Sequence, residues 1–163
     1  MKRLFALLAV TFLYCGSASA DSDVLNDPDV IALKGYDIGF VGMSLRHTGK
    51  GKEMVALCNE LLKSDPHNPD IHFEKGLQLR WLDRDQEALE SYNLAIKYNR
   101  DPLGEVYYER GQCLEALGRL EEALSDFEKA IELGFDLRDA YFFRNALRVK
   151  LGYYRKQREN RLN

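Results

Sequence analysis

Carboxylate side chains crowd the stretch "LGRLEEALSDFEKAIELG", which covers residues 117–134. Five of these residues are Asp or Glu, a density that could supply a general acid and base or the oxygen ligands of a cation. The apolar residues between them recur at the spacing of an amphipathic helix, on which neighbours point about 100° apart. Glu121 and Glu122 therefore diverge, and Asp126 and Glu128 fall with them on outward faces. We predict that the cluster is the solvated side of a helix.

The other residues that could carry chemistry form no recognisable constellation. The segment "GMSLRHTGKGK" at 42–52 contains Gly-Lys but lacks the glycine spacing of a phosphate-binding loop. His67 and His72 flank a turn without the Cys or carboxylate array of a metal site. No Ser/His/Asp or Cys/His arrangement is left unexplained by packing. The sequence thus predicts no catalytic residue, no metal, no cofactor and no enzyme.

Composition indicates a soluble domain. The chain has 163 residues, of which 45% are apolar and 30% are charged. This length and this apolar share are enough to build one hydrophobic core. The formal net charge is −3, so there is no general case for binding nucleic acid.

The first twenty residues have the layout of a secretory signal peptide. Two basic residues precede an eleven-residue apolar run, and small residues follow up to a cleavage site predicted after Ala20. The apolar run is too short to span a bilayer, which needs about 20 residues. The sequence therefore predicts an exported protein, periplasmic or secreted, with no integral span after cleavage. A retained anchor and lipidation at Cys15 are alternatives, the latter disfavoured by the bulky Tyr14 before it.

A period of 34 or 35 residues organises the rest of the chain. Residues 117–134 align 35 positions back with 82–99, "LDRDQEALESYNLAIKYN", which keeps Leu, Arg, Glu, Ala and Ile in phase. Residues 37–66 fall into the same phase one step of 34 earlier, and residues 139–157 begin another copy. Because the offset also holds upstream of both helices, the repeating unit is a helical pair.

These segments resemble the tetratricopeptide repeat family, whose unit of about 34 residues is a helix–turn–helix. The family skeleton in the third unit is Tyr107, Arg110, Gly111, Leu114, Ala123 and Phe127. In the second unit it is His72, Lys75, Gly76, Leu79, Ala88 and Tyr92. The resemblance implies an all-α, right-handed α-solenoid with three units and a partial fourth. The predicted divisions are a signal peptide at 1–20, an acidic leader at 21–34, repeats at 35–68, 69–103 and 104–137, and a partial fourth repeat with a polar capping helix at 138–163.

Glycine recurs at one phase in the middle of each first helix, as Gly42, Gly76 and Gly111. Glycine inside a helix costs about 1 kcal/mol relative to alanine. We therefore predict a close approach of two helices at these positions, with Ala88 and Ala123 opposite them.

The last segment departs from the repeat, because it ends in the polar and basic "YYRKQRENRLN". A solenoid needs a terminal element with a polar outer face. We predict a helix over 138–151 packed on the third unit, followed by a separate capping helix from about Tyr153.

Cys58 and Cys113 remain after export. The repeat places them a whole unit apart, whereas a disulfide needs Cα atoms within about 7 Å. We predict two free, buried thiols.

The resemblance also implies a concave groove lined by fixed places of the first helices. The candidate ligand-binding residues at these places are Met43, Arg46, His47, Phe73, Leu77, Arg80, Trp81, Tyr108, Gln112 and Phe142. Exposed aromatic and Arg side chains are typical of binding hot spots. The Arg and His among them suggest an acidic, partly apolar peptide. The alternative is that a short array curls and these residues cover one another or the leader.

The predicted function is that of an exported interaction module, an adaptor or scaffold that holds a peptide or protein segment in this groove. The alternative is a structural subunit of a cell-envelope or secretion assembly. Such a subunit could pair with itself through the convex face or the Tyr153–Tyr154 end, so homo-oligomers stay open.

Overall fold

The computed structural model describes residues 38–47, 49–135 and 137–162. The elements in this part of the chain are all α-helices joined by short turns. Their bounds are α4 (Ile38–His47), α5 (Gly51–Ser64), α6 (Pro69–Trp81), α7 (Asp85–Lys97), α8 (Leu103–Ala116), α9 (Leu120–Glu132) and α10 (Leu137–Leu162). The signal peptide predicted at 1–20 and the acidic leader predicted at 21–34 lie outside the described residues.

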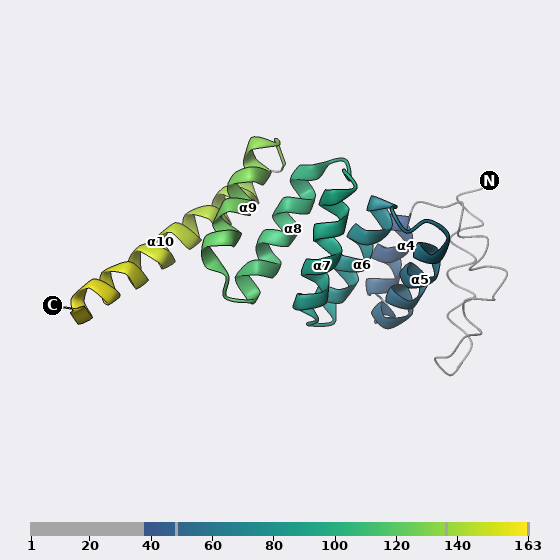
Figure 1. The fold of residues 1–163 in the computed structure, drawn as a ribbon, viewed down its shortest axis with the longest axis horizontal. Coiled ribbons are helices and arrows are strands. Elements are labelled where there is room, and N and C mark those ends of the chain that lie inside the picture. Colours follow the sequence, from purple (N-terminus) through teal and green to yellow (C-terminus); the bar gives the residue numbers. More distant parts are fainter. Residues whose placement is uncertain (1–37, 48, 136, 163) are drawn as a thin grey trace.

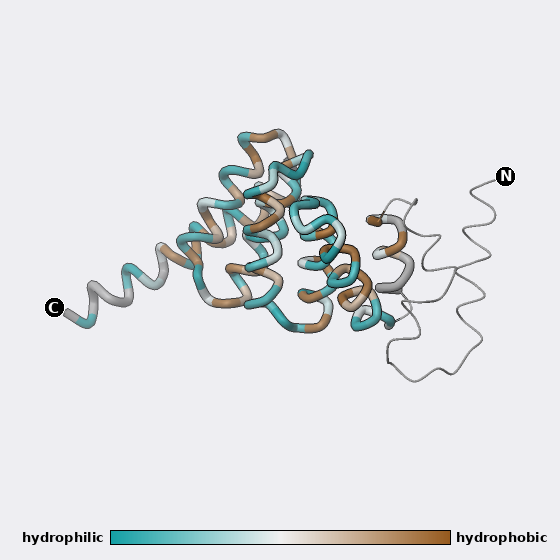
Figure 2. The backbone as a smooth tube through the Cα atoms, turned by 45° about the vertical axis from the view of Figure 1, so that its right-hand side comes forward, coloured by the Kyte–Doolittle hydropathy of each residue, from teal (hydrophilic) through white to brown (hydrophobic). Residues whose placement is uncertain are grey.

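The helices stack side by side in chain order (Figure 1). Helix α6 packs on α7 and α8 packs on α9 as helical hairpins, and α7 joins one hairpin to the next. The first helices α4, α6 and α8 also contact one another in sequence. Hydrophobic and hydrophilic residues alternate along the helices of the central array, as expected for helices with one buried face (Figure 2). The chain is therefore an all-α solenoid in which the first helices form one layer.

The turns that end α6 and α8 are alike, 35 residues apart. Asp83 and Gly118 both adopt left-handed backbone, with φ of 57° and 75°. The next backbone N–H in each case donates to a carbonyl of the preceding helix, Arg84 to Leu79 and Arg119 to Leu114, both at 2.9 Å. Asp is one of the few side chains that this conformation tolerates, which explains how it replaces glycine there.

The repeated glycines make room for aromatic rings. A Cβ at Gly76 would lie 2.6 Å from Cε1 of Tyr92, and one at Gly111 would lie 3.0 Å from Cε1 of Phe127. Both rings are fully buried. The prediction of a close approach is thus confirmed for Gly76 and Gly111, but the group opposite each glycine is the Tyr92 or Phe127 ring and not Ala88 or Ala123, as the sequence suggested. Gly42 is different, because a Cβ there would meet the carboxylate of Glu74.

Helix α10 corrects the predicted end of the chain. It is one continuous helix to Leu162 and extends beyond the rest of the array (Figure 1), where the sequence suggested two helices. Gly152 does not form a turn, because it lies inside the helix and is not among the described residues with positive φ. Ala140 and Leu147 are fully buried, and the Phe143 ring stacks on Phe127 at 5.5 Å, so the first part of α10 covers α9.

Cys58 and Cys113 are free and buried, as predicted. Burial raises the pKa of the Cys58 thiol to about 12, with the nearby Glu74 carboxylate adding to the effect. Burial also raises the pKa of Cys113 to about 11. Its Sγ lies 2.9 Å from the carbonyl oxygen of Asp85, to which it donates. These thiols pack helices together and remain protonated near neutral pH.

Candidate functional site: a groove on the first helices

A groove of about 610 Å³ opens on the layer of first helices. We call it the first-helix groove. Its lining residues are Met43 from α4, Leu77, Arg80 and Trp81 from α6, Asp83 from the following turn, and Glu105, Glu109 and Gln112 from α8. The residues from each helix are three or four positions apart, the spacing that brings side chains to one helix face. Repeat geometry therefore directs one face of each first helix into the groove.

The apolar part of the groove is unusually exposed. Trp81 is 68% exposed and Met43 is 48% exposed, although both are large hydrophobic side chains. Leu77 is partly buried and packs against the core, so it forms an apolar base beside them. Large apolar side chains at a hollowed surface are typical of binding sites for other molecules.

Ion pairs fix the polar part of the groove. The Arg80 guanidinium pairs with the Glu109 carboxylate and so ties α6 to α8. Arg100, which precedes α8, pairs with Glu105 at 2.8 Å and reaches Asp70 of α6 at 3.4 Å. These contacts hold the two walls of the groove at a fixed separation, and they engage Arg80 within the protein.

Arg100 also packs against a buried aromatic ring of α6. Its guanidinium lies 3.8 Å from the centre of the Phe73 ring, a distance at which a cation is attracted to the ring face. Its side chain is only 13% exposed. Arg100 thus links the buried aromatic core under α6 to the carboxylates on the surface.

Five predicted binding residues line the first-helix groove, and three others whose side chains are described do not. Those in the groove are Met43, Leu77, Arg80, Trp81 and Gln112. Phe142 is exposed on α10 and does not line the groove. Arg46 and His47 belong to α4, but their side chains lie outside the described part of the structure. A binding role for these residues stays a prediction.

The expectation that Phe73 and Tyr108 are exposed is wrong. Phe73 is 4% exposed and packs on Tyr92, with ring centres 5.9 Å apart. Tyr108 is 8% exposed and lies against Phe127 and Phe135. The family places predicted that both side chains point toward the groove, but packing against aromatic rings of the paired helix in the same hairpin takes them into the core.

Three acidic residues also line the groove, Asp83, Glu105 and Glu109; Glu105 occupies a groove-lining place of the family pattern, whereas Asp83 and Glu109 do not. A signal for two of them existed, since Glu105 and Glu109 are four residues apart and so share a helix face. The carboxylates also affect the pKa of a buried tyrosine. Burial raises the pKa of Tyr108, and the carboxylates of Asp139 and Glu109 raise it further. The wall formed by α8 is therefore acidic.

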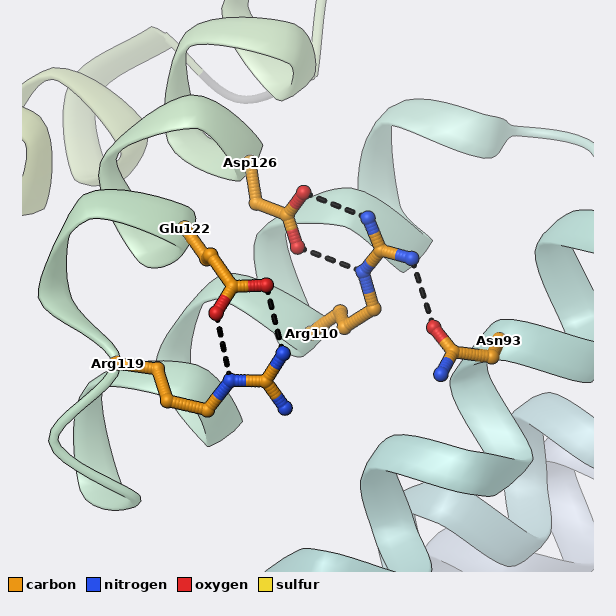
Figure 3. Close-up of polar contacts among 5 residues, drawn as sticks. All are labelled: Asn93, Arg110, Arg119, Glu122 and Asp126. Carbon is orange, nitrogen blue, oxygen red and sulfur yellow. Dashed lines mark hydrogen bonds and ion pairs between the residues drawn. The ribbon is translucent and has the colours of Figure 1, made fainter.

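The carboxylate cluster of α9 is partly structural, which corrects one prediction. Asp126 is 5% exposed and is not on the solvated face. Its two oxygens accept hydrogen bonds from Nε and Nη2 of Arg110, both at 2.7 Å (Figure 3). Arg110 also donates to the side chain of Asn93 at 2.8 Å, so the network joins α7, α8 and α9. The pair of Glu122 with Arg119 is exposed, as predicted.

Residues 38–47, 49–135 and 137–162 contain neither a metal-ligand cluster nor a membrane-spanning helix. No group of three or more His, Cys, Asp or Glu residues in these ranges could hold a metal ion. None of the helices there is both long and apolar enough to cross a bilayer.

The fold is an all-α solenoid that matches tetratricopeptide repeat solenoids of known structure. Residues 104–134 match the sequence pattern of the tetratricopeptide repeat family. These residues are α8 and α9, one hairpin of the array. Repeat solenoids of this fold are typically scaffolds for protein interaction. No curated protein matches the chain in sequence.

Particular relatives come from solved structures. The first repeat domain of the human RPAP3 protein is 25% identical, with a TM-score of 0.66, over 73% of this chain and 93% of that domain. The first repeat domain of Spaghetti (RPAP3), bound to the HSP90 peptide SRMEEVD, is 26% identical, with a TM-score of 0.65, over 71% of this chain and 90% of that domain. The chaperone SycD of Yersinia enterocolitica, in complex with a peptide of the translocator YopD, is 16% identical, with a TM-score of 0.62, over 82% of this chain and 98% of that one.

Proposed function

We propose that this protein is an interaction module that binds a peptide or protein segment in the first-helix groove. The observation that carries the proposal is the exposure of Trp81 and Met43 at a hollow of about 610 Å³ with fixed polar walls. Aromatic anchors surrounded by polar groups are the usual source of binding free energy at protein interfaces. The ion pair between Arg80 and Glu109 contributes by holding the walls before a ligand arrives.

The relatives support this proposal. The structure of Spaghetti (RPAP3) contains an HSP90 peptide, and that of the second repeat domain of human RPAP3 contains an HSP70 peptide. A hollow on the first helices of this chain would suit the same general task. Its ligand need not resemble theirs, because specificity depends on the side chains that line the site.

Export is part of the proposal and depends on residues 1–20 alone. An adaptor or scaffold in the periplasm or outside the cell would follow from cleavage after Ala20. Determination of the N-terminal residue of the protein purified from its native cell tests this directly. A first residue of Asp21 is expected, whereas an intact Met1 in a cytosolic fraction would contradict export.

Site-specific crosslinking tests the groove. A photoreactive amino acid at Met43 lies in the groove, and the same group at Glu90, on the exposed side of α7, is the matched control. Both variants are irradiated with a library of short peptides and analysed by mass spectrometry. The proposal expects peptide adducts at position 43 well above those at position 90. Equal yields at the two positions would contradict a groove-specific interaction.

A second candidate is a structural subunit that associates with itself. It is favoured by one face of α10, where Phe142 is 67% exposed and Val149, two helical turns further on, is 74% exposed. Ala146 lies between them and is also exposed. Sedimentation velocity discriminates the candidates. A dimer that Phe142→Glu converts to monomer supports self-association, and a wild-type monomer at high concentration argues against it.

A further inference from the structure

We propose that the segment bound in the first-helix groove is basic as well as apolar, with a Lys or Arg side chain beside a bulky apolar one. This inference rests on the proposed function and names the class of its ligand. It differs from the acidic peptide that the Arg and His residues of the sequence suggested.

The charges that line the groove carry the inference. Among the residues whose side chains are described, Asp83, Glu105 and Glu109 line it, against one guanidinium, that of Arg80. Arg80 already pairs with Glu109, so its charge is offset within the protein. An acidic ligand would have to compete with Glu109 for Arg80 and would meet two further carboxylates.

The guanidinium of Arg100 does not offset this excess of carboxylates. Arg100 pairs with Glu105 but also with Asp70, a second carboxylate. Among the described side chains, the three carboxylates of the groove together with Asp70 outnumber the guanidinium groups of Arg80 and Arg100 by two. Further along the same layer, Glu115 pairs with Lys150 at 3.9 Å, which adds no net positive charge.

The apolar residues lie where they could hold the stem of such a cation. Trp81 lines the same groove as Asp83 and presents an exposed ring. A ring face attracts Lys or Arg, and a carboxylate nearby pairs with the charged head. Met43 and Leu77 complete an apolar surface for the methylene stem and for a neighbouring apolar residue.

Charge also decides between this ligand and the chain's own leader. Residues 21–34 contain four Asp and one Lys, so the leader has the same sign as the groove. Like charges at close range oppose docking. A peptide such as SRMEEVD, which Spaghetti (RPAP3) holds, contains three carboxylate side chains and one Arg and would meet the same opposition here.

Three fluorescent peptides test the inference. They share an apolar core of Leu and Phe and differ only in flanking residues, which are Lys, Gln or Glu. Fluorescence anisotropy with the purified protein measures the Kd of each. The Lys peptide is expected to bind about tenfold more tightly than the Glu peptide. This difference should shrink at about 1 M salt, where the Debye length falls to about 3 Å.

Two substitutions localise the effect to the groove. Asp83→Asn removes a charge but keeps a side chain that tolerates positive φ, and Glu105→Gln removes a second charge. The double variant should bind the Lys peptide about fivefold more weakly and leave the Gln peptide unchanged. The matched control removes two exposed carboxylates from the second helices, Glu90→Gln with Glu121→Gln, and should change neither Kd.

The possible results distinguish a failure of this inference from a failure of the proposed binding function. Equal or tighter binding of the Glu peptide overturns the inference and leaves the groove as a binding site. An equal loss in the control variant also overturns it, because the preference would then reflect net charge alone. Failure of all three peptides to bind overturns the proposed function and the inference with it.

Discussion

Substitution of Gly76 by alanine should destabilise the protein although alanine is the better helix former. The new Cβ would lie 2.6 Å from Cε1, 2.8 Å from Cδ1 and 3.0 Å from Cζ of Tyr92. Tyr92 is fully buried and packs on Phe73 under the groove, so its ring cannot move into solvent. Overpacking of this kind costs about 1–3 kcal/mol, and three close contacts place this site near the upper end. The gain in helix propensity is about 1 kcal/mol, which leaves a net loss of about 2 kcal/mol.

Two other glycines provide a graded comparison. Gly111→Ala would place its Cβ at 3.0–3.2 Å from the Phe127 ring, a milder contact whose cost roughly cancels the gain in propensity. Gly152 lies inside α10 with nothing within 4 Å of a new Cβ, so Gly152→Ala should stabilise the helix by up to about 1 kcal/mol. The expected order of stability is Gly152→Ala, then Gly111→Ala, then Gly76→Ala.

Urea denaturation followed by circular dichroism measures this order. In a separate thermal unfolding experiment, a loss of about 2 kcal/mol for Gly76→Ala should lower the thermal midpoint by roughly 4–8 °C. In a Tyr92→Leu background the same substitution should cost much less, because the ring that it meets is gone. If Gly76→Ala were as stable as Gly152→Ala, the ring contact would not explain the repeated glycine, and the reasoning about the hairpin would fail.

The remaining predictions concern buried polar groups. Asp126→Ala leaves the partly buried Arg110 without its bidentate partner and should cost about 2 kcal/mol in urea denaturation, whereas Glu122→Ala, which breaks an exposed pair, should change little. Cys58 and Cys113 should resist a maleimide reagent at pH 8, because their raised pKa values keep both thiols protonated in the folded protein. Both should react fully in denaturant, and mass spectrometry counts the labels. Rapid labelling of the folded protein would contradict this prediction. The same shifts favour the folded state below the ordinary thiol pKa of 9.0, so the free energy of unfolding should decline as pH rises above that value, and a Cys58→Ala/Cys113→Ala variant should decline less.

Much of the fold could be predicted from the sequence because the same packing residues recur at the same positions of each repeat. The glycine phase of Gly76 and Gly111 recurs with an aromatic residue 16 positions later, and in the structure each ring lies against its glycine. The left-handed turn at Asp83 was harder to recognise than that at Gly118, since Asp adopts this conformation less often than glycine.

The site was predicted less well, because helix periodicity gives a face but not the depth of a side chain on it. Phe73 and Tyr108 belong to groove-lining places of the family pattern, yet rings from the neighbouring helices bury them. The pairing of Asp126 with Arg110 spans 16 residues and two helices, so spacing within one helix could not reveal it. The sign of the groove depends on contacts between α6 and α8, and only the fold brings these together.

The end of α10 was mispredicted for a related reason. Gly152 has the phase of the turn glycine Gly118, but α10 continues through it as one helix to Leu162. The Arg, Lys, Gln and Glu residues that follow Gly152 are good helix formers and favour this continuation.

The emission of Trp81 tests the central claim most directly. It is the chain's one tryptophan, it lies in the first-helix groove and it is 68% exposed. Titration with the Lys peptide, which contains no tryptophan, should shift the emission to shorter wavelength as the ring loses contact with water. The shift should saturate with the same Kd that anisotropy gives. Binding by anisotropy without any change in Trp81 emission would place the ligand elsewhere and contradict the assignment of the groove.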